Sequence, residues 1–181
     1  MGRPKLYCRE DVLSDAIQLF WKQGYKDTSL GDLERATGVN KSGLYSEFKD
    51  KDDLFVAGIQ HYLKTQAIVE LLGRKPLGWT NLEDFLLVGT RCERQKGCWV
   101  ANCIREFPVL PKRARSLIEA HLQTVQAAVE NNLRAVSLKI SAEDACDLLL
   151  TLNSGLALRL NLGPIPGIES RVQEFMNLLR A

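Results

Sequence analysis

The sequence predicts an all-α protein of about nine helices, arranged as an N-terminal three-helix unit followed by a larger helical domain. Apolar residues recur at helical spacing along most of the 181-residue chain. Several of these segments begin with Ser, Thr or Asp and carry Asp or Glu three residues later, which is the pattern of a capping box. The sequence lacks the two-residue alternation of strands and has no repeat. The loop with Gly73, Pro76 and Gly78 marks the clearest boundary.

The first part of the chain is expected to contain three helices and a fourth that links it to the second part. Val12 and Phe20 share one broad apolar face of the first helix, and Gly24 provides a stop just beyond it. Asp50 and Asp53 form a capping box at the start of the fourth helix. The expected helices are residues 9–23, 29–37, 41–48 and 51–72.

The second part is expected to contain five helices. Thr80 with Glu83, and Ser141 with Asp144, form two further capping boxes. Proline and glycine residues separate the segments. The expected helices are residues 80–95, 98–107, 112–138, 141–162 and 169–179.

Composition limits the function classes. The sequence is 45% hydrophobic and 25% charged, and it has no run of the roughly 18 apolar residues that a membrane span needs. The N-terminus MGRPKLYCRED is polar and lacks a signal peptide, so we expect a cytoplasmic protein whose five cysteines are reduced. The net charge is +2. Residues 1–60 hold nine basic and ten acidic residues, so nucleic-acid binding must depend on where the basic residues lie.

The sequence indicates neither an enzyme nor a metalloprotein. Zinc-protease, phosphate-loop and serine-hydrolase motifs are all missing. Cys92, Cys98 and Cys103 lie close in sequence, but their spacing lacks the short ligand pairs of metal sites. We therefore expect no catalytic residues, no metal and no cofactor.

Residues 28–55, TSLGDLERATGVNKSGLYSEFKDKDDLF, carry the most functional information. They read as two helices joined by a tight turn, in which Gly38 ends one helix and Asn40 caps the next. Leu44 and Phe48 anchor one side of the second helix. Its other side is polar and slender, which suits a helix that enters the major groove of DNA.

Each polar residue of this segment has an expected role. Lys41 can donate to guanine, while Tyr45 and Lys51 can reach phosphates, which set the register without reading sequence. The start of the fourth helix offers a further phosphate site through its amide groups. A helical hairpin that binds only protein is the alternative interpretation. The expected DNA-contacting residues are Arg3, Thr28, Ser29, Lys41, Ser42, Gly43, Tyr45, Ser46 and Lys51.

At these residues the chain resembles the tetracycline-repressor (TetR) family of regulators. The resemblance covers about residues 3–57 and rests on the leading GRP, on FWKQGYKDTSL and on RATGVNKSGLYSEFKDKDDLF. Two residues depart from the family pattern. Glu47 stands where members often carry His or Tyr against a phosphate, and Gly31 stands where some carry a longer polar side chain.

The resemblance implies a helix-turn-helix DNA-binding domain at residues 1–55, and a ligand-binding and dimerisation domain at 73–181. The apolar helices at 141–162 and 169–179 could pair across a two-fold axis as a four-helix bundle. In the alternative interpretation, both helices are internal core.

The expected effector pocket draws on aromatic, cysteine and a few polar residues of the second domain. Core packing is the alternative for each of them. Cys92, Cys98 or Cys103 could instead sense oxidants or electrophiles, as a cysteine in a similar Gly-Cys segment does in some family members. The candidate ligand-binding residues are Trp79, Phe85, Cys92, Cys98, Trp99, Cys103, Phe107, His121 and Arg159.

The sequence thus predicts a homodimeric DNA-binding regulator, a repressor that a small-molecule effector releases from its operator. A cysteine-based redox sensor is one alternative. A helical interaction protein that no longer binds DNA is the other.

Overall fold

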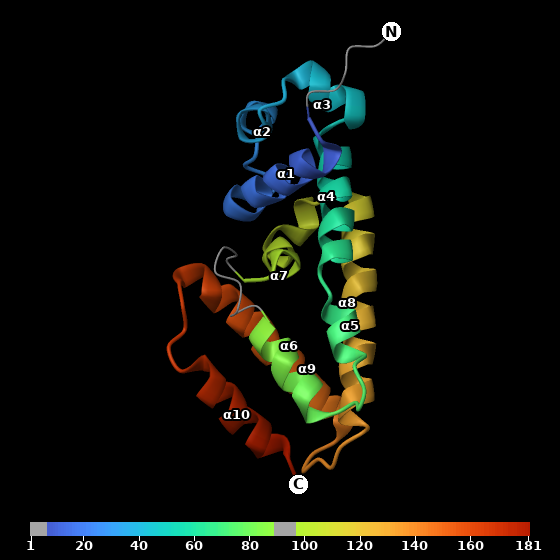
Figure 1. The fold of residues 1–181 in the computed structure, drawn as a ribbon, viewed down its shortest axis with the longest axis vertical. Helices are drawn as coiled ribbons and strands as arrows, with labels where there is room; N and C mark the ends of the chain where they lie inside the picture. The colour runs from blue at the N-terminus through green and yellow to red at the C-terminus, as the bar shows by residue number, and fades with distance from the viewer. Residues whose placement is uncertain (1–6, 89–96) are drawn as a thin grey trace. The chain divides into compact units, whose positions relative to one another are not determined.

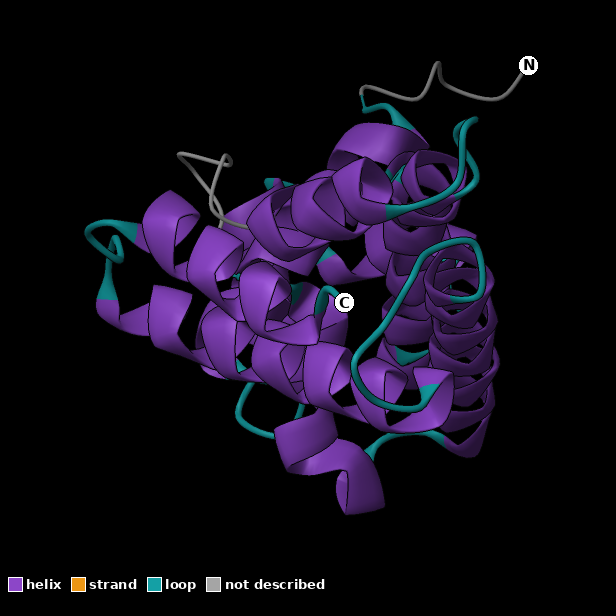
Figure 2. Ribbon diagram, turned by 90° about the horizontal axis from the view of Figure 1, so that it is seen from below, coloured by secondary structure: helices purple, strands orange, loops and turns teal. Residues whose placement is uncertain are grey.

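The computed structural model describes residues 7–88 and 97–181, and helices dominate both ranges (Figure 2). Within these ranges the only extended pairing is one isolated antiparallel bridge between Leu138 and Arg180. The expected all-α class is therefore confirmed. None of the described helices is long and apolar enough to span a membrane.

The chain forms two compact units. Unit 1 consists of Met1–Thr65 together with Cys103–Glu119, and unit 2 consists of Gln66–Asn102 together with Ala120–Ala181. The sequence analysis divides the chain near residues 55–73. In the structure, a second segment from the middle of the chain also belongs to the N-terminal unit.

Unit 1 gathers its first three helices beside the fourth (Figure 1). Val12, Ala16 and Phe20 are buried, which confirms the expected apolar face of the first helix. Its core includes an edge-on contact between Phe20 and Phe55, whose ring centres lie 5.0 Å apart. The elements of unit 1 are α1 (Arg9–Gln23), α2 (Leu30–Thr37), α3 (Lys41–Glu47), α4 (Lys51–Thr65), η2 (Ile104–Val109) and the first residues of α8 (Lys112–Leu133).

The fourth helix differs from the expectation of one helix over 51–72. The structure divides it into α4 and a short α5 (Ile68–Leu72). The hydroxyl of Thr65 donates to the carbonyl of Tyr62 at 2.9 Å. Such local bonds compete with the helical ladder, which gives a physical reason for the break after Thr65.

In unit 2, α6 packs against α5, α9 and α10, and α6, α9 and α10 run side by side (Figure 1). Its core is aliphatic, with Leu82, Leu133 and Met176 among the fully buried side chains. The elements of unit 2 are α5, α6 (Trp79–Leu87), α7 (Trp99–Cys103, up to Asn102), the rest of α8, α9 (Ala142–Arg159), η3 (Leu160–Leu162) and α10 (Ile168–Leu179).

The expected capping boxes of the second part have different outcomes. Ser141 accepts the amide of Asp144 at 3.0 Å, which confirms the N-cap. The Asp144 carboxylate accepts the Ser141 hydroxyl at 2.6 Å, in place of the backbone amide that a capping box would use. The box of Thr80 with Glu83 is wrong, because α6 begins at Trp79 without a side-chain cap. Glu83 instead accepts a hydrogen bond from Arg180 at the end of the chain. A tertiary ion pair has replaced a local cap.

A buried amide holds the loop between α5 and α6 against α8. The Oδ1 atom of Asn132 accepts the amide of Gly78 and the side-chain amide of Asn81, each at 2.9 Å. Its Nδ2 atom donates to the carbonyls of Leu72 and Ala128 at 2.8 and 2.9 Å. The side chain of Asn132 thereby satisfies polar groups that the core would otherwise leave unpaired.

We predict that Asn132→Ala lowers the free energy of unfolding by about 2–4 kcal/mol, because the Gly78 amide and the Leu72 carbonyl lose their buried partner. Chemical denaturation measures this change. The neighbouring Asn131 is exposed, so Asn131→Ala serves as the control and should shift stability by less than about 0.5 kcal/mol. Equal effects of the two substitutions would contradict the role given to Asn132.

Candidate nucleic-acid interface

Side-chain caps begin both α2 and α3. The Ser29 hydroxyl accepts the amide of Asp32 at 3.2 Å, and the Asp32 carboxylate accepts the Ser29 amide at 2.8 Å. Hydrogen bonds from Ser29 hold the pKa of Asp32 below its ordinary value. Gly38 ends α2 with a φ of +66°, and Asn40 caps α3 by accepting the amide of Gly43 at 2.8 Å. The segment therefore forms two short helices whose ends are well satisfied.

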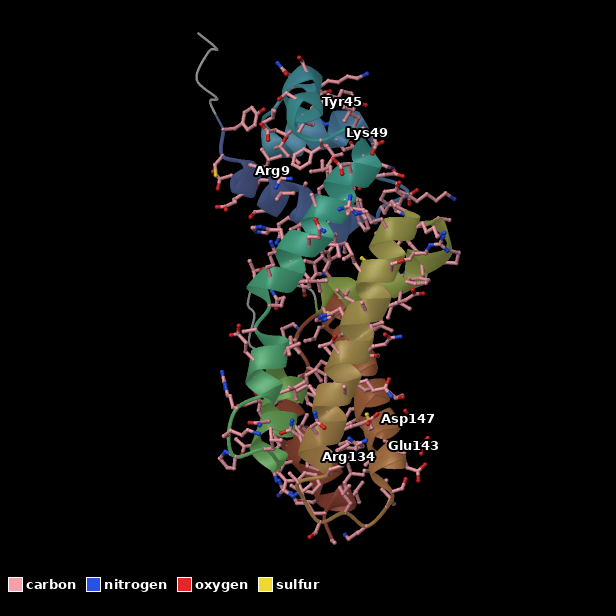
Figure 3. The ribbon with its side chains drawn as sticks, turned by 90° about the vertical axis from the view of Figure 1, so that its right-hand side faces the viewer. Arg9, Tyr45, Lys49, Arg134, Glu143 and Asp147 are labelled. Carbon is pink, nitrogen blue, oxygen red and sulfur yellow. The ribbon has the colours of Figure 1, made fainter. Side chains whose placement is uncertain are left out.

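The third helix has one buried and one exposed side. Leu44 and Phe48 are each only 2% exposed, as the sequence analysis expects of the anchoring face. Four of the expected DNA-contacting residues, Lys41, Ser42, Tyr45 and Ser46, are exposed. Figure 3 shows Tyr45 on the same end of unit 1 as Lys49. The Lys41 ammonium lies 5.7 Å from the centre of the Tyr45 ring.

Tyr7 secures α3 in a way that the sequence analysis missed. Its hydroxyl donates to the carbonyl of Gly43 at 3.0 Å and lies 3.3 Å from the Ser46 hydroxyl oxygen. A side chain at position 43 would place its Cβ only 2.6 Å from Cγ1 of Val39. Gly43 is thus required by packing within unit 1. The sequence feature that could have indicated this role is an aromatic residue directly before the first helix.

The departure at Glu47 has a structural explanation. Its side chain is only 11% exposed, and its Oε2 atom lies 3.9 Å from Nε of Arg9. The Arg9 guanidinium also lies 4.8 Å from the centre of the Phe48 ring. The carboxylate is therefore neutralised within unit 1 and does not extend from the exposed side of α3.

Thr28 requires a correction. From the sequence, Thr28 is expected to contact DNA, but the residue is 1% exposed. Its hydroxyl donates to the carbonyl of Gly24 at 2.6 Å. Thr28 therefore closes the loop between α1 and α2 and presents no hydroxyl at the surface. Ser29, the next residue, is exposed.

Lys51 also turns toward this loop. Its ammonium donates to the carbonyls of Tyr25 and Thr28, each at 3.0 Å. It lies 4.4 Å from the centre of the Tyr25 ring, a cation–π distance. Two of its three N–H donors are thus used within unit 1.

The start of α4 is capped by the chain's own carboxylates. Asp50 accepts the amide of Asp53 at 2.8 Å, and Asp53 accepts the amide of Lys49 at 3.2 Å. The carboxylates of this cap interact with the positive end of the helix dipole, where a phosphate contact is expected from the sequence. Asp52 nearby accepts a hydrogen bond from the Tyr25 hydroxyl. Burial, followed by this bond, raises the pKa of Tyr25.

The candidate effector residues are distributed over both units. Phe85 belongs to the core of unit 2 and Trp99 is buried, whereas Arg159 is exposed. Trp79 lies under the guanidinium of Arg180, 5.1 Å from ring centre to Cζ. His121 is half-buried, and burial lowers its pKa.

Phe107 and Cys103, two further effector candidates, belong to unit 1. Arg3 and Cys92 lie outside the described residues.

The described cysteines lie in different surroundings. Cys103 and Cys146 are buried, and burial raises the pKa of Cys146 to about 11, with Glu130 and Asp147 adding to the effect. Figure 3 shows Asp147 on α9, near Arg134. Cys98 is half-buried. Within residues 7–88 and 97–181, His, Cys, Asp and Glu form no cluster of three that could hold a metal ion.

Comparison with known proteins places this architecture among regulators. Residues 12–57 match the family described as bacterial regulatory proteins, tetR family. The HTH-type transcriptional repressor ComR of Escherichia coli is 35% identical over 128 residues, which span 66% of this chain and 61% of ComR. An uncharacterised HTH-type transcriptional regulator of Bacillus subtilis, YezE, is 32% identical over 142 residues, spanning 75% of this chain and 73% of YezE.

Solved structures share the fold. A cysteine-substituted form of the TetR-family regulator CifR, bound to 26-base-pair operator DNA, superposes with a TM-score of 0.81 at 20% identity. The superposition covers 98% of this chain and all of that one. At this level of identity the likeness concerns the fold.

We predict that Lys51→Gln lowers the free energy of unfolding by about 1.5–3 kcal/mol, because two charge-assisted hydrogen bonds to carbonyls are lost. Denaturant titration measures the loss. Lys49→Gln removes the same charge from an exposed position two residues away, and it should change stability by less than about 0.5 kcal/mol. If Lys51→Gln is as stable as Lys49→Gln, the ammonium does not hold the loop.

Proposed function

This chain belongs to the tetR family of bacterial regulatory proteins, and we propose that it is a homodimeric transcriptional repressor. It binds operator DNA through α2 and α3, and a small molecule bound in unit 2 releases it. The observation that carries the proposal is the third helix, which has a buried anchoring face and an exposed face of slender polar and cationic residues.

The exposed residues of α3 divide into two roles. Lys41 and Ser42 stand at the start of the helix, where side chains meet base edges in the major groove. Lys41 suits guanine, and Ser42 can donate or accept. Tyr45, Ser46 and Ser29 suit phosphate contacts, because hydroxyls position a protein on the duplex without reading sequence. Ser46 also donates to the Gly43 carbonyl at 2.7 Å, which orients its hydroxyl.

Three further residues contribute to the proposed interface outside α3. Arg3 would supply an arm to the DNA. Lys51 keeps one N–H for a phosphate, after the two that it donates to carbonyls. Gly31 has no packing demand, since a Cβ there would meet its nearest neighbour, Nη1 of Arg35, at 3.6 Å. A short residue at Gly31 therefore leaves the start of α2 open to the approach of a phosphate.

The α9 helix supports the proposed dimer. Leu148, Thr151, Gly155, Leu158 and Leu162 follow one another at alternating spacings of three and four residues, the period of a helix–helix seam. Leu148, Leu158 and Leu162 are 48%, 43% and 92% exposed. A Cβ at Gly155 would meet nothing within 4 Å. A glycine that no contact within the chain requires costs helix stability, and close approach of a partner helix explains it.

The opposite face of α9 is internal. Ala145, Leu149 and Leu156 are buried in the core of unit 2. In α10, Val172 and Met176 are likewise buried, while Leu178 is 72% exposed. Both interpretations of these helices thus apply to different faces. One face builds the core, and the other is available to a second subunit.

Cysteine-based sensing is a second candidate for the release step. Cys98 is half-buried and directly precedes α7, whereas Cys103 and Cys146 are buried. A thiol at an accessible position can react with oxidants, while a buried thiol of raised pKa is inert. In this version the oxidant or electrophile takes the place of a reversibly bound effector.

Fluorescence anisotropy with DNA fragments flanking the gene, at two salt concentrations, tests the proposed function. We expect sequence-selective binding that weakens steeply with salt. Lys41→Ala should reduce the preference for operator over unrelated DNA by about tenfold or more, since one bidentate base contact is worth about 1–3 kcal/mol. Lys64→Ala, at an exposed lysine of α4, is the control. Absence of DNA binding by the wild type would reject the proposal. Repeating the titration with an added oxidant tests whether a cysteine mediates the release from DNA.

We predict that Gly155→Glu converts the protein from a dimer to a monomer of about 20.3 kDa, as measured by sedimentation equilibrium. The new side chain has room within the chain and favours helix over glycine, so the monomer should stay folded. Across a two-fold axis, however, it would bring two carboxylates together. Gln123→Glu on the exposed face of α8 is the control and should remain dimeric. A dimeric Gly155→Glu protein would place the interface elsewhere.

A further inference from the structure

A residue outside the helix-turn-helix segment holds the loop between α1 and α2. Glu106 lies in η2, and both Glu106 and this loop belong to unit 1. Its Oε2 atom accepts the amide of Tyr25 at 2.8 Å, and its Oε1 atom accepts the amide of Lys26 at 2.9 Å. One carboxylate thus takes two successive backbone donors that follow the end of α1.

The loop is shaped to receive this carboxylate. Consecutive amide groups that point the same way form a concave anion site, and hydrogen bonds to a charged acceptor are stronger than neutral ones. Gly24, which precedes the two amides, has a φ of +86°. A Cβ at Gly24 would lie 2.5 Å from Oε2 of Glu106. The backbone conformation therefore favours glycine at position 24, and a side chain there would also displace the Glu106 carboxylate.

The same loop determines where α2 and α3 lie relative to α1. It leads directly into Ser29, the cap of α2. Its carbonyls at Gly24, Tyr25 and Thr28 accept hydrogen bonds from the Thr28 hydroxyl and the Lys51 ammonium. Glu106 is the member of this set that comes from the distant segment Cys103–Glu119. The geometry of the DNA-contacting helices consequently depends on a residue far along the chain.

The chain just before Glu106 is held to α9 within unit 2. Gly97 packs so closely that a Cβ there would lie 2.1 Å from the carbonyl oxygen of Ala157. Asn102 accepts the side-chain amide of Asn161 at 2.8 Å. Only three residues separate Asn102 from Glu106 in the sequence. Gly97 and Asn102 are therefore held within unit 2, whereas Glu106 is held within unit 1.

We propose that Glu106 is a positioning residue for DNA binding, through which the segment after α7 controls the loop between α1 and α2. When Glu106 holds the Tyr25 and Lys26 amides, α2 and α3 are preorganised for the operator. When Glu106 does not hold these amides, the preorganisation is lost, which weakens binding in proportion to the competent population. The inference rests on the proposed function and assigns the geometry of its DNA-binding helices to a named contact.

The test compares Glu106→Gln with the wild type. The amide replaces one acceptor oxygen by a donor, which cannot bond to a backbone N–H. Hydrogen exchange at the Tyr25 and Lys26 amides should accelerate by about tenfold or more. Affinity for the operator should fall by about tenfold. The salt dependence should stay unchanged, because no cationic phosphate contact is removed.

Two further variants make the test specific. Glu106→Asp keeps the charge but shortens the side chain, and it should show the same losses because one carboxylate no longer reaches both amides. Glu119→Gln removes a charge from an exposed position of the same unit, and it should behave as the wild type does. Circular dichroism establishes that each variant is folded.

The outcomes separate the two proposals. Accelerated exchange with an unchanged operator affinity overturns the inference, because Glu106 would then be only structural. Unchanged exchange overturns it as well, because the contact would not protect the loop. A wild type that binds none of the fragments overturns the proposed function, and the inference with it. A loss of operator affinity confined to the two Glu106 variants supports both.

Discussion

The backbone between α1 and α2 needs hydrogen-bond partners where it leaves the helix, and three side chains of unit 1 supply them. The end of a helix leaves polar groups unpaired, and burying them without partners is costly. Glu106 supplies the acceptors, Lys51 the donors, and Thr28 closes the turn. The orientation of α2 and α3 follows from this loop, so the exposed face of α3 depends on contacts that lie well away from it.

In unit 2, one neutral side chain pairs the polar backbone groups of a loop between two helices. Asn132 pairs donors and acceptors from the loop between α5 and α6, beside a core that is mostly aliphatic. A neutral amide avoids the desolvation penalty that a buried charge would bring. In unit 1 the corresponding contacts lie nearer the surface, where charged partners are tolerated.

Charge placement in unit 1 reconciles a near-neutral composition with the proposed DNA contact. Many of its carboxylates are used internally: Asp32 and Asp50 in caps, Glu47 against Arg9, and Glu106 on backbone amides. The exposed side of α3 carries Lys41 and hydroxyl groups. Net charge is therefore a poor guide for this chain, because what a phosphate meets is the local arrangement.

The sequence by itself determined the helical class, most helix positions and the anchoring face of α3, because apolar spacing and local caps act over a few residues. Only the tertiary structure decided what Lys51, Glu47 and Glu83 contact. Each pairs with a group set by the folded chain, over separations that reach 97 residues between Glu83 and Arg180. Glu106 and Asn132 show the same limit. The type of a polar residue shows that it needs a hydrogen-bond partner when it is buried, but packing over long sequence separations determines which group becomes that partner.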